Sequence, residues 1–270
     1  MLKRKIYQKL VDWKRTHKNN CLMVEGARQV GKTYIIREFG KKEYESFIEI
    51  NFIKNQELKQ IFNGSLDADS IYKRMSAMIN GVNFVKGNTL IFLDEIQACG
   101  NARTALKFLA EDGRFDVITS GSLLGLTYGE DADENTEEPE SVPTGYEMFL
   151  TMYSLDFEEF LWAKGYKEEQ IEDIYKCMLE TKPLSTIQYD VMMSNFKEYM
   201  VVGGMPAIVD RFVTQKNYSG ILEMQKQILL DYEEDITKYA GGLEHGKILN
   251  VYRKIPVFLG NENKKFQITK

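Results

Sequence analysis

A run of eight residues with glycine in its first and sixth places constrains this chain more than any other feature. Residues 26–33 read GARQVGKT, the pattern of a phosphate loop: glycine, any four residues, glycine, lysine, then serine or threonine. The apolar run CLMVE precedes it, and the helical sequence TYIIREFGKK overlaps its end and continues beyond it. The pattern therefore predicts a buried strand, a phosphate-binding turn and a helix in direct succession.

Each part of this loop suits one part of a nucleoside triphosphate. Gly26 and Gly31 let the backbone wrap with its amides pointing at phosphate oxygens. Lys32 would place its ammonium on the β- and γ-phosphates, and the hydroxyl of Thr33 would offer an oxygen to Mg²⁺. The N-terminal end of the helix adds a partial positive charge. The residues expected to contact ATP are Gly26, Ala27, Arg28, Gln29, Val30, Gly31, Lys32, Thr33 and Tyr34.

The composition is that of a globular protein. The chain has 270 residues, of which 43% are hydrophobic and 28% charged, so it can bury a large core. No apolar run approaches the roughly 18 residues that span a bilayer, and the N-terminus lacks the apolar stretch of a cleavable signal. We therefore expect a soluble, cytoplasmic protein without membrane contact. Cys21, Cys99 and Cys177 are far apart, which favours reduced packing residues over disulfides or a zinc site.

The acidity of the chain is concentrated in one segment. The net charge is −5, and residues 130–140 (EDADENTEEPE) hold seven carboxylates and no lysine or arginine, which leaves +2 on the remainder. No apolar residue larger than alanine lies there, so we expect a solvated loop over residues 128–142, with partner docking as the alternative. The near-neutral remainder neither requires nor excludes nucleic acid.

Strands and helices alternate along the first 155 residues. The predicted helices cover residues 3–16, 67–82 and 104–113, and the predicted strands cover residues 46–52, 90–93, 115–125 and 146–155. This order implies parallel β-α-β units, with a central sheet between two layers of helices. Beyond residue 155 the pattern is helical, interrupted mainly by GGMP at residues 203–206. The fold class is therefore α/β, followed by a helical region.

Two carboxylates follow an apolar strand and form a second candidate site. Residues 90–93 (LIFL) are typical of a strand buried on both faces, and Asp94 and Glu95 follow at once. In nucleotide-hydrolysing P-loop proteins an acid in this place holds Mg²⁺, so we expect Asp94 beside Thr33. Glu95 is the candidate general base for the attacking water. The alternative is that both carboxylates only cap the segment that follows.

The strand after that ends in small hydroxyl residues. Thr119, Ser120 and Ser122 would lie near the γ-phosphate if this strand neighbours the phosphate-loop strand. We select Ser120 as the hydroxyl that senses or polarises the phosphate. An ordinary strand exit with small residues is the alternative.

Several longer segments resemble one known group. The segments GARQVGKTYIIREFG, FLDEIQ, KFLAEDGRFDVITSGSLLG, YSLDFEEFLWAKG, GGMPAIV and DYEEDITKYA together resemble bacterial and archaeal AAA+ superfamily ATPases with a poorly characterised C-terminal domain. The resemblance extends from about Lys3 to Lys270. It implies a five-stranded parallel P-loop sheet in which the Ser120 strand separates the Asp94 strand from the loop strand. A helical lid and a winged helix would follow.

The resemblance also implies a division of the chain and further contacts. It gives an ATPase core over residues 1–154, a helical lid over 155–240 and the start of a winged helix over 241–270. Relatives continue into a nuclease-like fold, so this chain is expected to be truncated, and a nucleic acid or protein client would act through the missing part. Within GGMP, Gly204 and Pro206 are expected to close over adenine and ribose. Relatives carry a basic residue where this chain has Tyr146.

The leading interpretation is a Mg²⁺-dependent ATPase of the hydrolase class that couples ATP and ADP states to lid movement. Lys32, Glu95 and Ser120 are its candidate catalytic residues. A nucleotide-binding switch or scaffold with negligible hydrolysis is the alternative. A small-molecule kinase is disfavoured because the lid is not arginine-rich, and a GTPase because no guanine signature appears. Self-association could supply an arginine finger, for which the candidates are Arg103, Arg114, Arg211 and Arg253.

Overall fold

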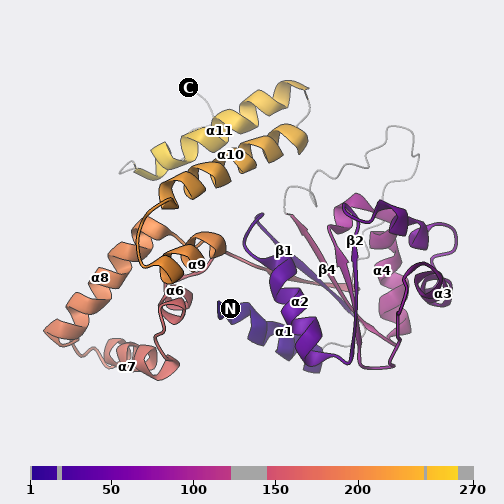
Figure 1. Cartoon of the computed structure of the whole chain (residues 1–270), viewed down its shortest axis with the longest axis horizontal. Helices are drawn as coiled ribbons and strands as arrows, with labels where there is room; N and C mark the ends of the chain where they lie inside the picture. Colours follow the sequence, from indigo (N-terminus) through magenta and orange to yellow (C-terminus); the bar gives the residue numbers. More distant parts are fainter. Residues whose placement is uncertain (1, 17–19, 123–144, 240–241, 261–270) are drawn as a thin grey trace.

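The computed structural model describes residues 2–16, 20–122, 145–239 and 242–260 (Figure 1). The acidic loop predicted over residues 128–142 lies outside these residues. Within the described ranges, no helix has both the length and the apolar character that a bilayer span requires.

A five-stranded parallel sheet forms the centre of the N-terminal part. Its order is β2-β3-β4-β1-β5. The strands are β1 (Cys21–Gly26), β2 (Ser46–Asn51), β3 (Thr89–Asp94), β4 (Asp116–Ser122) and β5 (Glu147–Thr151). β4 lies between β3 and β1, so the α/β fold class and the strand order that the resemblance implied are both confirmed. Because all strands are parallel, β1, β3 and β4 end at the same edge of the sheet.

Helices cover both faces of this sheet (Figure 1). They are α1 (Lys5–Thr16), α2 (Lys32–Glu43), α3 (Ala68–Met78) and α4 (Gly100–Asp112), with short 3₁₀ helices η1 (Gln56–Phe62) and η2 (Ile96–Ala98). Asp67 caps α3 as predicted, accepting a hydrogen bond from the Ser70 amide. α3 ends at Met78, earlier than predicted. η1 was not predicted because so short a helix shows no apolar period.

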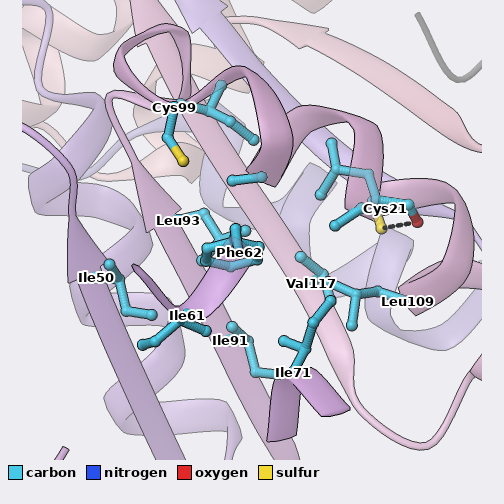
Figure 2. Packing of buried hydrophobic residues seen from close by; sticks show 14 of the residues in the cluster. Cys21, Ile50, Ile61, Phe62, Ile71, Ile91, Leu93, Cys99, Leu109 and Val117 are labelled. Atoms are coloured by element: carbon cyan, nitrogen blue, oxygen red, sulfur yellow. Dashed lines mark hydrogen bonds between the residues drawn. The ribbon is translucent and has the colours of Figure 1, made fainter. Parts of the chain in front are cut away.

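Two apolar clusters pack against opposite faces of the sheet. The predicted strand over residues 90–93 shows how, because Ile91 and Leu93 enter one cluster while Leu90 and Phe92 enter the other. Figure 2 shows the first cluster, in which Phe62 of η1 lies among residues of the sheet, α3 and α4. Burial on both faces explains why this strand reads as a continuous apolar run.

The cysteines behave as packing residues in the described structure. Cys21 and Cys99 are buried and Cys177 is half-buried, and all three are free thiols. The Cys21 thiol lies 3.5 Å from the Leu106 carbonyl oxygen (Figure 2), and burial raises its pKa. A thiol held protonated in this way is a poor nucleophile and metal ligand.

Beyond the sheet the chain is helical, as predicted. The helices are α6 (Phe157–Ala163), α7 (Glu168–Leu179), α8 (Thr186–Val202), α9 (Pro206–Gln215), α10 (Ile221–Tyr239) and α11 (Gly242–Gly260). A third, smaller cluster packs around Phe160, Val209 and Phe212. α10 and α11 lie side by side as a helical pair (Figure 1). The winged helix predicted to start in residues 241–270 stays a prediction.

The N-terminal basic residues join the two regions. Arg4 is buried; its guanidinium donates to the Val30 carbonyl at 3.0 Å and the Tyr153 carbonyl at 2.7 Å, and its Nε lies 3.2 Å from a carboxylate oxygen of Glu159 in α6. Lys5 pairs with Asp156 and Glu158, each at 2.6 Å, and Lys3 pairs with Glu168. These cations therefore make contacts within the chain.

Candidate nucleotide-binding site

The predicted phosphate loop connects β1 to α2 at the carboxyl edge of the sheet. Gly31 has φ 97° and ψ 21° immediately before α2 begins at Lys32, a left-handed conformation that glycine adopts without strain. At Gly26 an added Cβ would lie 2.2 Å from the Met152 carbonyl oxygen. Both glycines are therefore required by the backbone itself, the first by close approach and the second by its conformation.

Lys32 lies inside this loop. Its ammonium donates to the carbonyls of Gly26 at 2.8 Å and Ala27 at 2.9 Å, and the residue is 9% exposed. Burial lowers the pKa of this ammonium, while the negative charges of Glu95 and Asp94 oppose that shift. An anionic ligand in the loop would replace the two carbonyls as the partner of the ammonium.

Asp94, the predicted metal ligand, accepts hydrogen bonds from side chains of three other elements. Its carboxylate, 2% exposed, accepts from the Thr33 hydroxyl at 3.2 Å on each oxygen and from the Asn51 side-chain amide at 2.8 Å. The Ser120 hydroxyl donates to the same carboxylate. Oxygen atoms of a carboxylate and a hydroxyl are the donors that Mg²⁺ takes in proteins, so the Thr33 and Asp94 side chains fit this ion.

Asn51 is a site residue that the sequence analysis missed. It pairs with Asp94 in the register of β2 and β3, and its side-chain oxygen accepts from the amides of Ile53 at 3.1 Å and Lys54 at 2.9 Å. These bonds fix the orientation of the amide that holds Asp94. The available signal was a polar residue ending an alternating strand, at the same sheet edge as Asp94.

Glu95 follows β3 in a left-handed conformation, with φ 57° and ψ 50°. This conformation is unfavourable for a residue with a side chain and is concentrated at functional sites. Its carboxylate accepts a hydrogen bond from the Gln97 amide and borders the cavity at the phosphate loop.

The three hydroxyls of β4 have different surroundings. Ser120 is 1% exposed and bonds Asp94, so it contacts the expected metal ligand and does not border the cavity. Thr119 points into the core, with its hydroxyl 3.0 Å from the Met23 sulfur. Ser122 ends the strand beside Gly26. The selected hydroxyl therefore acts on Asp94 in this structure.

A cavity of about 590 Å³ opens over the phosphate loop. Three cationic side chains border it, Arg28, Lys32 and Arg37, and Arg37 is held by two hydrogen bonds from its Nε, at 3.0 and 2.8 Å, to the Glu49 carboxylate. The remaining lining residues are Gln29, Gly31, Thr33, Tyr34, Ile53, Glu95, Asp231, Glu234 and Asp235. The last three belong to α10, so a helix distant in sequence forms one wall.

A second cavity of about 310 Å³ lies on the other side of Gly31 and Tyr34, which border both. Pro206 of α9 lines it, together with Leu2, Arg4, Ile35, Met152, Ala207 and Asp210. Gly204 does not line this cavity. Its backbone packs on the backbone of Leu155, and a Cβ added at Gly204 would lie 2.1 Å from the Leu155 carbonyl oxygen. The structure thus separates Pro206, at a cavity, from Gly204, at a backbone contact.

The part of the chain that holds the sheet matches a known protein family. Residues 18–161 match the family described as AAA domain, which covers more than half of the chain. The chain belongs to the AAA domain family. In this AAA protein, residues 193–270 also match a domain of unknown function (DUF8612). No curated protein sequence matches the chain.

Two solved structures are similar to this AAA protein. The Walker-type ATPase PABY2304 of Pyrococcus abyssi is 13% identical, with a TM-score of 0.46, and the match covers 96% of this chain and 78% of that one. AMPPCP-bound DnaA from Aquifex aeolicus is 14% identical, with a TM-score of 0.44, and the match covers 96% and 77%.

The departure at Tyr146 lies far from the phosphate loop of the AAA domain. Tyr146 precedes β5, its carbonyl accepts from the Cys21 amide at the start of β1, and its hydroxyl donates to Glu111 at 2.8 Å. Since β1 runs away from this point toward Gly26, a charge at position 146 would not reach the phosphates from here.

None of the four candidate finger arginines borders the cavity in the described residues. Arg114 pairs with Asp112 at 2.8 Å, and Arg253 with Glu233 at 2.7 Å. Arg211 donates to the Ser219 carbonyl at 3.0 Å, and Arg103 lies on α4. Within one chain these arginines therefore have other positions, and a finger from a second copy stays a prediction.

Proposed function

We propose that this AAA protein binds and hydrolyses ATP with Mg²⁺. The observation that carries the proposal is the convergence on Asp94: Thr33 from the loop, Ser120 from β4 and Asn51 from β2 all bond one buried carboxylate. A structural helix cap would not need three partners from separate elements. The arrangement supports the proposal, because a buried carboxylate and a hydroxyl, the oxygen ligands that Mg²⁺ prefers, lie beside a loop whose backbone suits phosphate.

Different residues of the chain have different roles in the proposed reaction. The loop amides and the Lys32 ammonium hold the β- and γ-phosphates, after Lys32 leaves the carbonyls of Gly26 and Ala27. Glu95 takes a proton from the attacking water as it adds to the γ-phosphorus, and ADP leaves. Ser120 and Asn51 orient Asp94. When bound by Thr33 and Asp94, Mg²⁺ neutralises developing phosphate charge.

The second cavity suits the base and ribose. Ile35, Met152 and Pro206 offer apolar surface, and Tyr34 lies between this cavity and the phosphate loop. In the proposal, closure of α9 over the base couples nucleotide state to movement of the helical region. This occurs in the cytoplasm, where ATP and Mg²⁺ are available.

Titration calorimetry with Mg²⁺-ATP and steady-state hydrolysis on the whole chain test the proposal. Glu95→Gln should lower hydrolysis by about 10²- to 10⁴-fold and leave ATP binding intact. Lys32→Ala should abolish binding. Glu57→Gln, at an exposed residue of η1, is the matched control and should match the parent. Absence of ATP binding by a folded parent chain would refute the proposal.

A nucleotide-binding switch is the second candidate. One observation favours it: no described arginine of the lid borders the cavity, so none of them supplies a finger to the site of its own chain. Tight binding without turnover at any protein concentration would establish the switch. A rate that rises more than linearly with protein would instead point to self-association. A nucleic acid or protein client, reached through a nuclease-like C-terminal part as in the group that the sequence resembles, belongs to the same set of proposals.

A further inference from the structure

Helix α10 contacts the phosphate loop directly through consecutive turns. The Tyr232 hydroxyl donates to the Arg28 carbonyl at 2.8 Å, and the Gln29 side-chain amide donates to Asp231 at 2.6 Å. The Arg28 guanidinium lies 2.7 Å from a carboxylate oxygen of Asp235. Three side chains of one helix thus hold two adjacent residues of the loop.

These contacts involve Gln29 and the residue before it, where the loop has an unfavourable backbone conformation. Gln29 has φ 64°, which is unfavourable for a residue with a side chain, and neighbouring contacts must support it. Its side chain bonds Asp231, and the residue before it carries both other contacts. The conformation of the loop is therefore supported by α10.

The same helix gives the cavity an acidic wall. Asp231, Glu234 and Asp235 border it beside the loop residues Arg28 and Gln29, and Asp235 is 6% exposed. ATP carries several negative charges into this space, so phosphate oxygens and Asp235 compete for Arg28, and the wall repels the ligand. Binding of a triphosphate and retention of the Arg28–Asp235 ion pair are therefore opposed to each other.

We propose that α10 is a clasp that holds the phosphate loop through Asp231, Tyr232 and Asp235 and is released when a nucleoside triphosphate takes Arg28. This rests on the proposed function and adds the device that links the site to the helical region. Arg28 exchanges a carboxylate for phosphate oxygens, Tyr232 and Asp231 lose their partners, and α10 moves with the adjoining α11. No bond is made or broken covalently.

Two variants separate the clasp from a general charge effect. Tyr232→Phe removes only the hydroxyl that bonds the Arg28 carbonyl and leaves the charge unchanged. Asp235→Asn removes the ion pair. Glu234→Gln is the matched control, because Glu234 lies on the same helix and borders the same cavity, but none of the hydrogen bonds or ion pairs above involves it.

The experiment measures binding of β,γ-methylene-ATP with Mg²⁺ by calorimetry and amide exchange of residues 228–237 by mass spectrometry, on the whole chain. We expect Asp235→Asn to bind about fivefold tighter than the parent and Tyr232→Phe about twofold tighter. Glu234→Gln should change affinity less than either. In the parent, the nucleotide should speed exchange in α10 about tenfold, because release exposes the helix to local opening.

The outcomes distinguish the two proposals. Binding by the parent with unchanged α10 exchange, or equal gains from Glu234→Gln and Asp235→Asn with none from Tyr232→Phe, would overturn the clasp and leave the ATP site standing. Absence of binding in the parent and all variants would overturn the ATP site and the clasp together.

Discussion

The sheet region and the helical region of this AAA protein are built with different amounts of core. Among the residues that the structure describes, 22 and 14 buried apolar residues form one cluster on each face of the sheet, whereas the principal cluster of the helical region has eight. α8 illustrates the difference, because Val202 is its one buried apolar residue and Ile187 and Met200 are largely exposed. Regions with few buried contacts open most readily.

The difference assigns the two regions different tasks. The sheet fixes Asp94, Thr33 and Asn51 relative to one another, which a metal site requires. The helical region contributes Pro206 and the residues of α10, which in the proposed function approach or leave the nucleotide. The smaller core of the helical region is consistent with that proposal, because regions with few buried contacts open more readily.

The largest expected effect comes from removing a fully buried ring in each region. Phe92→Ala should lower the free energy of unfolding of the sheet region by about 4 kcal/mol, since a cavity between sheet and helices cannot collapse. Phe160→Ala should cost about 2 to 3 kcal/mol, because the smaller cluster can relax around it.

The two tryptophans make this comparison measurable. Trp13 lies in α1 and Trp162 in α6, so Trp162→Phe and Trp13→Phe each leave a fluorescent reporter in one region. In urea, Phe92→Ala should shift mainly the Trp13 transition and Phe160→Ala mainly the Trp162 transition. Equal shifts of both signals would mean that the regions unfold as one unit.

Arg4 tests how firmly the regions are joined. Arg4→Leu leaves Glu159 as a buried carboxylate without its cation, so it should destabilise the Trp162 transition by about 3 kcal/mol. Adding Glu159→Leu should recover part of that loss. Lys3→Ala, which removes an exposed pair with Glu168, should have little effect. Equal losses from Arg4→Leu and Lys3→Ala would contradict a buried junction.

A substitution at Asn51 tests the sheet region, and we expect it to have a smaller effect than the changes above. Asn51→Ala removes one hydrogen bond to Asp94, so we expect about a tenfold fall in kcat and a higher Mg²⁺ requirement, with ATP affinity nearly unchanged. Asn63→Ala, an exposed asparagine after η1, is the control. A rise in KM with unchanged kcat would show that Asn51 does not orient the metal ligand.

Lys32 gives the smallest effect, a dependence on pH. Burial lowers its pKa below the ordinary 10.5, so between the lowered value and 10.5 the unfolded chain holds more protons than the folded chain. The cost of burying the ammonium is present below that window and is relieved as pH rises through it. The stability advantage of Lys32→Met over the parent should therefore shrink between pH 7 and 10, measured by urea unfolding.

Local sequence patterns predicted the candidate site residues at the carboxyl edge of the sheet. They did not predict the residues of α10 that border the same cavity. The phosphate loop, Asp94 and Glu95 each follow an apolar strand, so short segments carried enough information. The role of Asn51 could not be predicted without knowing which strands end side by side at the same edge of the sheet. The role of α10 depends on contacts between residues some two hundred positions apart in the sequence. In sequence, Asp231 and Asp235 read as the solvated face of an ordinary helix.

The segment between β5 and α6 restricts which substitutions the protein can accept during evolution. Gly26 packs on the Met152 carbonyl and Gly204 on the Leu155 carbonyl, and the Leu155 amide donates to the Gly204 carbonyl at 2.7 Å. Main-chain atoms alone meet at both places, so a larger residue at either glycine has no side chain opposite that could shrink in compensation. Among relatives we expect these glycines to stay fixed without covarying partners, leaving the joint between the two regions invisible to methods that infer contacts from paired substitutions.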